Sequence, residues 1–136
     1  MTTEPNNLES IRTFAEAYTA AWCSQKPESV AACYEENGSL QVNDEAPAAG
    51  REAITRVAQG FMTAFPDMRV TMDNVELQND GAIYHWMLTG TNNGPAGTGR
   101  AVHISGFEVW QIGAGGLIAQ STGHFDSAEY RRQLEL

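Results

Sequence analysis

Basic residues are scarce in this chain. Of its 136 residues only 8 are Lys or Arg, against 17 Asp or Glu, so the formal net charge is −9. Binding of nucleic acid requires clustered basic side chains that contact phosphates, and an anionic membrane surface also attracts basic segments. The charge therefore argues against a nucleic-acid partner and against docking on a membrane.

Cysteines and long apolar runs are also few. Cys23 and Cys33 are the two cysteines, and they form neither a CxxC motif nor a His-rich cluster. They fit reduced, buried thiols better than a disulfide framework or a zinc site. No stretch approaches the ~20 apolar residues of a membrane-spanning helix. The opening MTTEPNNLES lacks the basic and apolar regions of a secretory signal. We therefore expect a cytoplasmic protein with a single domain over residues 1–136.

Helical periodicity occupies the first half of the chain and its C-terminal end. The apolar positions of residues 8–22 recur every three or four residues, which predicts an amphipathic helix. A short helix is expected over 27–34, and a third is expected between Gly50 and Pro66. A final short helix is expected over 127–134.

The pattern changes to the alternation typical of strands after the third helix. Strands are predicted over residues 39–43, 69–78, 82–92, 101–112 and 117–125. The alternation of the second of these changes phase near Asp73-Asn74, which predicts a β-bulge and a curved sheet. Helices followed by a meander of long strands indicate an α+β fold with the helices on one face of a mainly antiparallel sheet.

The glycine-rich turn before the last strand suggests which side chains face each other. If that turn is symmetric, His103 lies opposite Asp126, and His124 shares their face, while the other face is apolar. If the strands on either side of the preceding Gly/Pro-rich loop pair in the same way, Gly90 lies near His103 and Asn92 lies on the same polar face. Because a carboxylate beside an imidazole can act as a general acid–base pair, we predict a catalytic site at Asp126, His103 and Asn92.

Aromatic side chains are expected to surround this site. Apolar walls with a few polar groups are typical of pockets for small, ring-shaped ligands. The residues predicted to contact such a ligand are His124, Tyr18, Trp22, Phe61, Phe65, Trp86 and Phe107. The histidines are too far apart for a metal site, and the glycines do not follow the strand–turn–helix pattern of a dinucleotide site. We therefore expect no metal and no dinucleotide cofactor.

The sheet is expected to have a second apolar face. Residues 82–88 are apolar on both faces, and the predicted outer face of the next strand carries Trp110. A sheet covered by helices on one side alone would expose that tryptophan to water. We therefore predict a homodimer that forms through the sheet face.

Several short motifs together are similar to those of one known family. They are Phe65-Pro66-Asp67, Leu88-Thr89-Gly90-Thr91, Gly94-Pro95, Gly97-Thr98-Gly99-Arg100, Gly106-Phe107, Asp126 and Gln133-Leu134. From about residue 11 to residue 134 the chain resembles the SnoaL-like polyketide cyclases, or ester cyclases, of the nuclear transport factor 2-like superfamily. The resemblance implies a cone-shaped α+β fold with a deep central pocket, a dimer, and no metal or organic cofactor.

The resemblance also implies a reaction. In these cyclases an Asp near the end of the last strand removes a proton α to a carbonyl, and the carbanion attacks a second carbonyl. Asp126 matches that Asp, whereas Asn92 replaces the usual His and can donate a hydrogen bond without shuttling a proton. Together with the predicted register, the resemblance gives the leading hypothesis: aldol cyclisation or isomerisation of a polyketide- or steroid-like substrate, with Asp126 as base, His103 as its partner and Asn92 as oxyanion donor.

Two alternatives stay open from the sequence. Asp126 also fits the N-cap of the final helix, because Asp126-Ser127-Ala128-Glu129 is a variant of the capping box. If that is its whole role, the protein is a non-catalytic domain that binds a small apolar ligand, or a dimerisation module whose pocket is filled by its own side chains.

Overall fold

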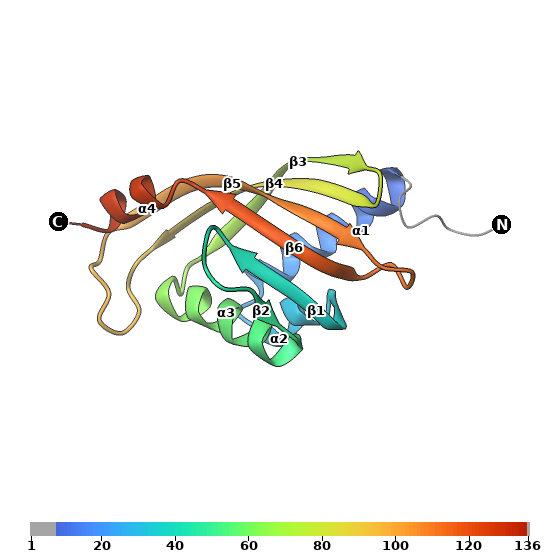
Figure 1. Ribbon diagram of the computed structural model, residues 1–136. Coiled ribbons are helices and arrows are strands. Elements are labelled where there is room, and N and C mark those ends of the chain that lie inside the picture. The colour runs from blue at the N-terminus through green and yellow to red at the C-terminus, as the bar shows by residue number, and fades with distance from the viewer. Residues whose placement is uncertain (1–7, 136) are drawn as a thin grey trace.

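Helices lie against one side of a curved six-stranded sheet in the computed structural model, which describes residues 8–135 (Figure 1). The elements in chain order are α1 (Leu8–Cys23), α2 (Pro27–Ala31), β1 (Tyr34–Val42), β2 (Ala48–Ala49), α3 (Arg51–Ala64), β3 (Arg69–Gln78), β4 (Gly81–Thr91), β5 (Ala101–Ile112), β6 (Ile118–Phe125) and α4 (Ser127–Leu134). The expected α+β fold is confirmed. None of the helices described is long and apolar enough to cross a membrane.

The helical layer buries the apolar stripes that the sequence predicts. Ile11, Tyr18 and Trp22 of α1 are buried, and α1 packs along β3. α3 packs against α2 and β1. It ends at Ala64, because the proline two residues further on disfavours helical backbone before it and cannot supply an N–H. The core therefore lies between α1, α3 and the inner face of the sheet.

The strand order is β2-β1-β6-β5-β4-β3. β3 to β6 form the predicted antiparallel meander, whereas β1 pairs with β6 in parallel. β1 begins at Tyr34 rather than at residue 39, so the second predicted helix is shorter than expected and ends at Ala31. The predicted bulge is confirmed, since the pairing of β3 with β4 shifts between Met72 and Asn74. Such a bulge increases the curvature of the sheet around the helices.

The predicted register of β5 and β6 is wrong by two residues. Gly106 pairs with Phe125 and Phe107 pairs with His124, because the pairing shifts next to Ile112 and the turn is not symmetric. Asp126 lies beyond the end of β6, so it does not face His103. A shift of two residues keeps each side chain on its face of the sheet, so the sorting into two faces is correct.

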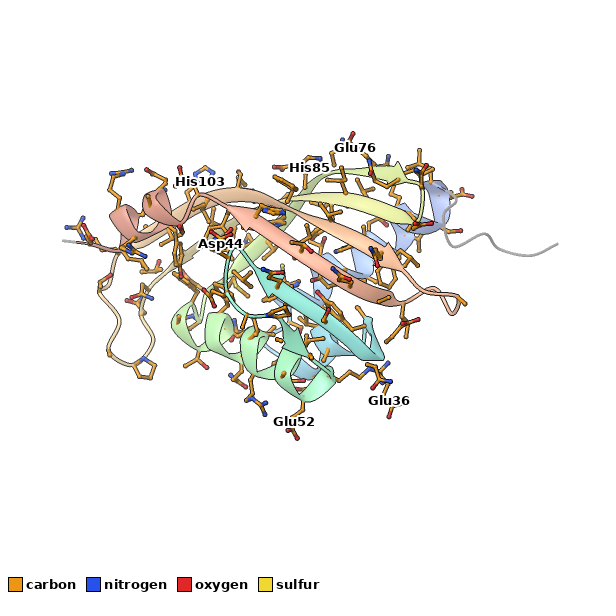
Figure 2. All side chains as sticks on the ribbon, in the orientation of Figure 1. Glu36, Asp44, Glu52, Glu76, His85 and His103 are labelled. Atoms are coloured by element: carbon orange, nitrogen blue, oxygen red, sulfur yellow. The ribbon has the colours of Figure 1, made fainter. Side chains whose placement is uncertain are left out.

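The assignment of those faces to the inside and outside is inverted. Trp110 belongs to the inner face and is 1% exposed, whereas the outer-face Phe107 is 36% exposed and stacks on His124 at 4.8 Å. Figure 2 shows His85, Glu76 and His103 along the side of the sheet away from α2 and α3. Trp110 is therefore not on an uncovered face, and the expectation of a homodimer from its exposure is wrong. The homodimer itself stays a prediction, which the molecular mass in solution checks.

Candidate functional site

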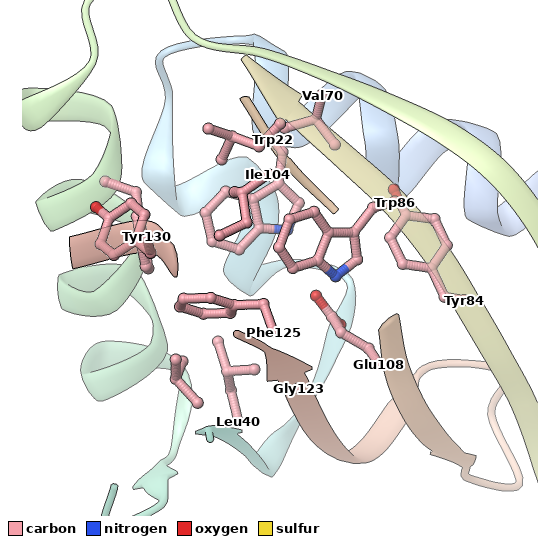
Figure 3. Close-up of a pocket in the computed structure, with 13 residues that line it drawn as sticks. Trp22, Leu40, Val70, Tyr84, Trp86, Ile104, Glu108, Gly123, Phe125 and Tyr130 are labelled. Carbon is pink, nitrogen blue, oxygen red and sulfur yellow. The ribbon is translucent and has the colours of Figure 1, made fainter. Parts of the chain in front are cut away.

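A pocket lies between the inner face of the sheet and the helices (Figure 3). The empty space within it, counted together with the open solvent at its mouth, is about 660 Å³. The walls come from α1, α3, α4 and every strand except β2. They are Trp22, Leu40, Val42, Phe61, Val70, Tyr84, Trp86, Leu88, Ile104, Glu108, Gly123, Phe125 and Tyr130. Nearly all of the lining is apolar, so one charged residue in it is conspicuous.

Glu108 is the acidic residue of this lining. It lies on the inner face of β5, between Tyr84 of β4 and Gly123 of β6, and it is 7% exposed. Because Gly123 has no side chain, β6 leaves space beside the carboxyl group: a Cβ there would lie 3.7 Å from Glu108 Cγ. Figure 3 shows the carboxyl group pointing into the pocket.

One oxygen of Glu108 is held by three donors. Oε1 accepts hydrogen bonds from the Tyr18 hydroxyl at 2.9 Å, from Trp110 Nε1 at 2.8 Å and from Ser121 Oγ at 2.8 Å. Since the Tyr18 hydroxyl donates to Glu108, it accepts the hydrogen bond that joins it to the Tyr34 hydroxyl at 2.9 Å. The carboxyl group therefore has a fixed orientation, and these bonds leave Oε2 free to face the pocket.

Burial sets the protonation chemistry of this cluster. Desolvation raises the pKa of Glu108, and the hydrogen bonds from Trp110, Ser121 and Tyr18 offset part of that rise. Burial, together with the charge of Glu108, raises the pKa values of Tyr18 and Tyr34 well above their usual value, so both hydroxyls stay protonated and can donate. A carboxyl group with a raised pKa is suited to general acid–base catalysis near neutral pH.

Two tryptophans bring further polar atoms to the pocket. The indole nitrogens of Trp22 and Trp86 are buried, and no described residue accepts a hydrogen bond from either. The Trp22 N–H lies near the Tyr18 hydroxyl and opposes the rise that burial causes in the pKa of that group, although the contact lacks hydrogen-bond geometry. The pocket thus combines apolar walls, one carboxyl group and buried N–H donors, the composition of a site for an apolar ligand with an acceptor oxygen.

The predicted pair of Asp126 and His103 is not formed. Asp126 is exposed, and its Oδ1 accepts a hydrogen bond from Glu129 N at 3.0 Å, so it caps α4 as the alternative reading expected. His103 is exposed on the outer face, where its Nε2 lies 2.9 Å from Met87 Sδ. The sheet itself therefore separates His103 from the pocket.

Asn92 also lies outside the pocket. Its Oδ1 accepts from Thr98 N at 2.7 Å and its Nδ2 donates to Ala64 O at 3.4 Å, so the side chain holds the loop between β4 and β5. Across this loop β4 pairs with β5 so that Thr89, rather than the predicted Gly90, lies opposite His103. The predicted polar cluster is thus dispersed over a loop, a helix cap and the outer face.

The predicted ligand-contacting residues lie in four different positions. Trp22, Phe61 and Trp86 line the pocket, and Tyr18 lies outside the lining as a donor to Glu108. Phe65 is fully buried in the core, with its ring 6.4 Å from that of Tyr130. The remaining two, Phe107 and His124, lie on the outer face.

Glu108 is the residue that the sequence analysis missed. Its signal was visible, because it is in phase with Ile104 and Trp110 on β5 and is therefore a charged residue within an apolar stripe. That stripe was predicted to lie on the outer face of the sheet, so Glu108 was not considered as a pocket residue. Within residues 8–135, no group of three His, Cys, Asp or Glu side chains is placed to hold a metal ion.

The family profile of the SnoaL-like polyketide cyclases matches residues 12–134. The chain belongs to this family. Comparison with curated protein sequences gave no significant match.

Solved structures of similar shape include several small α+β proteins. A protein assigned to the SnoaL-like polyketide cyclases from Jannaschia sp. CCS1 has a TM-score of 0.82 at 14% identity, over 98% of this chain and 96% of that chain. TsrD from Streptomyces laurentii has a TM-score of 0.81 at 22% identity, over 94% and 96%. A hypothetical protein with a ketosteroid isomerase-like fold from Catenulispora acidiphila DSM 44928, in complex with trimethylamine, has a TM-score of 0.79 at 15% identity, over 89% and 91%. At these identities the likeness concerns the fold.

Proposed function

We propose that this protein is an enzyme that moves a proton next to a carbonyl group of a small, apolar, ring-bearing molecule, with Glu108 as the acid–base group. The observation that carries the proposal is the state of that carboxyl group. Oε1 is fixed by three hydrogen bonds, while Oε2 faces a pocket with apolar and aromatic walls. Membership of the SnoaL-like family supports the same class of chemistry.

The reaction begins with the Glu108 carboxylate. Oε2 takes a proton from the carbon α to the carbonyl, the electron pair of that C–H bond forms the enolate double bond, and the negative charge moves to the carbonyl oxygen. In an isomerisation, the Glu108 carboxylic acid then returns the proton to another carbon of the ligand. In an aldol closure, the enolate carbon attacks a second carbonyl, and the new alkoxide takes the proton from Glu108.

Burial makes Glu108 a better candidate for this step than Asp126. Its raised pKa makes the carboxylate a stronger base than an exposed one, and its three donors stabilise the ionised form at the same time. Asp126 is exposed to solvent, and one of its oxygens is engaged in the cap of α4. The role that the family resemblance implies for Asp126 is therefore proposed here for Glu108.

Hydrogen–deuterium exchange tests the proposal without knowledge of the natural substrate. Cyclic ketones of one to three rings, among them 2-tetralone, are incubated with the protein in D2O, and deuterium uptake at the α carbons is followed by mass spectrometry. We expect the wild-type protein to accelerate exchange above the buffer rate. Glu108→Gln should return exchange to the buffer rate, and Asp126→Asn, which keeps a helix cap, should match the wild type.

Other outcomes would replace the proposal. Ketone binding without any exchange would leave the non-catalytic ligand-binding domain as the function. Exchange that persists in Glu108→Gln and disappears in Asp126→Asn would return the base to Asp126.

A further inference from the structure

The indole N–H of Trp86 is a buried donor that the fold itself does not use. Native proteins rarely leave such a group unpaired, because a buried donor without an acceptor loses the hydrogen bonds that it makes with water in the unfolded chain. No residue within 8–135 accepts a hydrogen bond from Trp86 Nε1, and Trp86 lines the pocket. The natural partner of this N–H is therefore whatever occupies the pocket.

The close approach of Trp86 to the backbone of β5 determines where this N–H lies in the pocket. Trp86 pairs with Gly106, and a Cβ at Gly106 would lie 2.5 Å from Trp86 Cζ2. Cζ2 is bonded to the ring carbon that carries Nε1, so the N–H edge of the indole lies across β5. A glycine at 106 is what permits this position of the ring.

The same edge of the indole is close to the proposed base. Glu108 is two residues along β5 from Gly106, so Trp86 and Glu108 are diagonal neighbours on one face of the sheet. Figure 3 shows the Trp86 nitrogen and the Glu108 carboxyl group directed toward the same part of the pocket. They do not hydrogen-bond each other, so the indole N–H keeps its donor capacity for another acceptor.

We infer that Trp86 Nε1–H donates a hydrogen bond to the carbonyl oxygen of the ligand and strengthens that bond as the oxygen becomes an enolate. The inference rests on the proposed function in assigning that oxygen to the reacting carbonyl. A carbonyl oxygen that accepts this hydrogen bond from Trp86 Nε1 places its α carbon beside Glu108 Oε2. The ligand is therefore a cyclic ketone, oriented by one N–H donor, rather than any apolar ring of the right size.

Trp22 provides a matched comparison. Its indole nitrogen is also buried without an accepting residue, and it lines the same pocket. Its N–H lies near the Tyr18 hydroxyl of the same helix, α1, whereas the N–H of Trp86 lies beside the Glu108 carboxyl group (Figure 3). Trp22→Phe removes an indole N–H and part of a ring from the same pocket wall, so it is the control for the loss of an indole as such.

A pair of ligands separates this hydrogen bond from apolar packing. Tetralin has the rings of 2-tetralone without its oxygen, and calorimetry gives the affinity of each for wild type, Trp86→Phe and Trp22→Phe. Trp86→Phe should weaken 2-tetralone binding about 5-fold, the scale of one neutral hydrogen bond, and leave tetralin within about 2-fold. Trp22→Phe should change the two ligands equally. Equal changes for both ligands in Trp86→Phe would overturn the inference.

An NMR measurement on the wild-type protein keeps the test independent of any variant's folding. The three tryptophans give three indole N–H signals, and 2-tetralone should move the signal of Trp86 downfield while tetralin does not. Absence of that ketone-specific shift overturns the inference.

The exchange assay distinguishes failure of the inference from failure of the proposed function. Trp86→Phe should slow deuterium exchange about 100-fold, as the loss of an oxyanion donor does in other enzymes. Ketone-specific binding through Trp86 without any exchange would overturn the proton-transfer proposal and its enolate step, and would leave the hydrogen bond from Trp86 to the ligand carbonyl standing. Exchange that needs Glu108 but is unchanged in Trp86→Phe would sink the inference alone.

Discussion

The two faces of β5 carry polar side chains in opposite situations. On the inner face, Glu108 is buried, accepts three hydrogen bonds and borders an apolar pocket. On the outer face, His103 and Ser105 are exposed to water. An exposed polar residue has no desolvation cost, whereas a buried carboxyl group requires partners that offset its cost. The candidate site therefore lies at the buried carboxyl group that accepts three hydrogen bonds, and not on the face where polar side chains are more numerous.

The largest expected effect comes from deleting the buried carboxyl group. Glu108→Leu leaves three donors without an acceptor, so we expect a loss of about 3–5 kcal/mol in the free energy of unfolding. Ser105→Ala, on the opposite face of the same strand, should stay within about 0.5 kcal/mol. Urea denaturation measures both.

A combined variant checks the cause of that loss. Adding Tyr18→Phe and Ser121→Ala to Glu108→Leu removes two of the stranded donors, so part of the stability should return. Tyr18→Phe and Ser121→Ala are also measured singly. If the triple variant is less stable than Glu108→Leu by the sum of these two single losses, the three groups do not act as one cluster.

The pH dependence of the free energy of unfolding should also report the burial of Glu108 on the inner face. Burial raises the pKa of Glu108 in the folded protein above its value in the unfolded chain, so the folded state binds this proton more tightly. Its stabilising contribution is complete below the unfolded pKa of about 4.3 and is lost as the pH rises through the folded pKa. The loss amounts to about 1.4 kcal/mol for each unit by which the pKa is raised.

Glu108→Gln provides the reference for this measurement, because glutamine does not ionise. Urea midpoints of the two proteins, measured across this pH range, should show the wild type losing stability relative to Glu108→Gln as the pH rises. A constant difference would mean that Glu108 titrates as a surface carboxyl group does.

The smallest expected effect concerns Asp126. Asp126→Ala removes the N-cap of α4 and should cost about 1 kcal/mol, whereas Asp126→Asn preserves the cap and should be nearly neutral. Thermal unfolding measures both. Neither change should slow deuterium exchange, and a loss of exchange in well-folded Asp126→Asn would contradict the assignment to Glu108.

Local patterns predicted much of the fold. The predicted bounds of β5 and α4, residues 101–112 and 127–134, match the structure, and the bulge in β3 lies where the alternation changes phase. These features follow from side-chain periodicity within one segment. The parallel pairing of β1 with β6 was not predicted, because it joins segments about eighty residues apart that carry no shared local signal.

The site was predicted less well than the fold. Trp22, Phe61 and Trp86 were placed correctly in the pocket wall, because large aromatic residues on inward stripes face the helices or the sheet. The predicted catalytic cluster depended on a symmetric turn, and the irregular pairing next to Ile112 removed that premise.

By itself the sequence determined the order of helices and strands, the alternation along each strand and the family, because all of these are properties of neighbouring residues. It also determined that β5 has one face with His103 and another with Glu108. Only the tertiary structure decided which of these faces lies under the helices. A strand has the same alternation whichever side is covered, so the choice depends on where α1 and α3 pack, and that packing places Glu108 in the pocket and His103 in solvent.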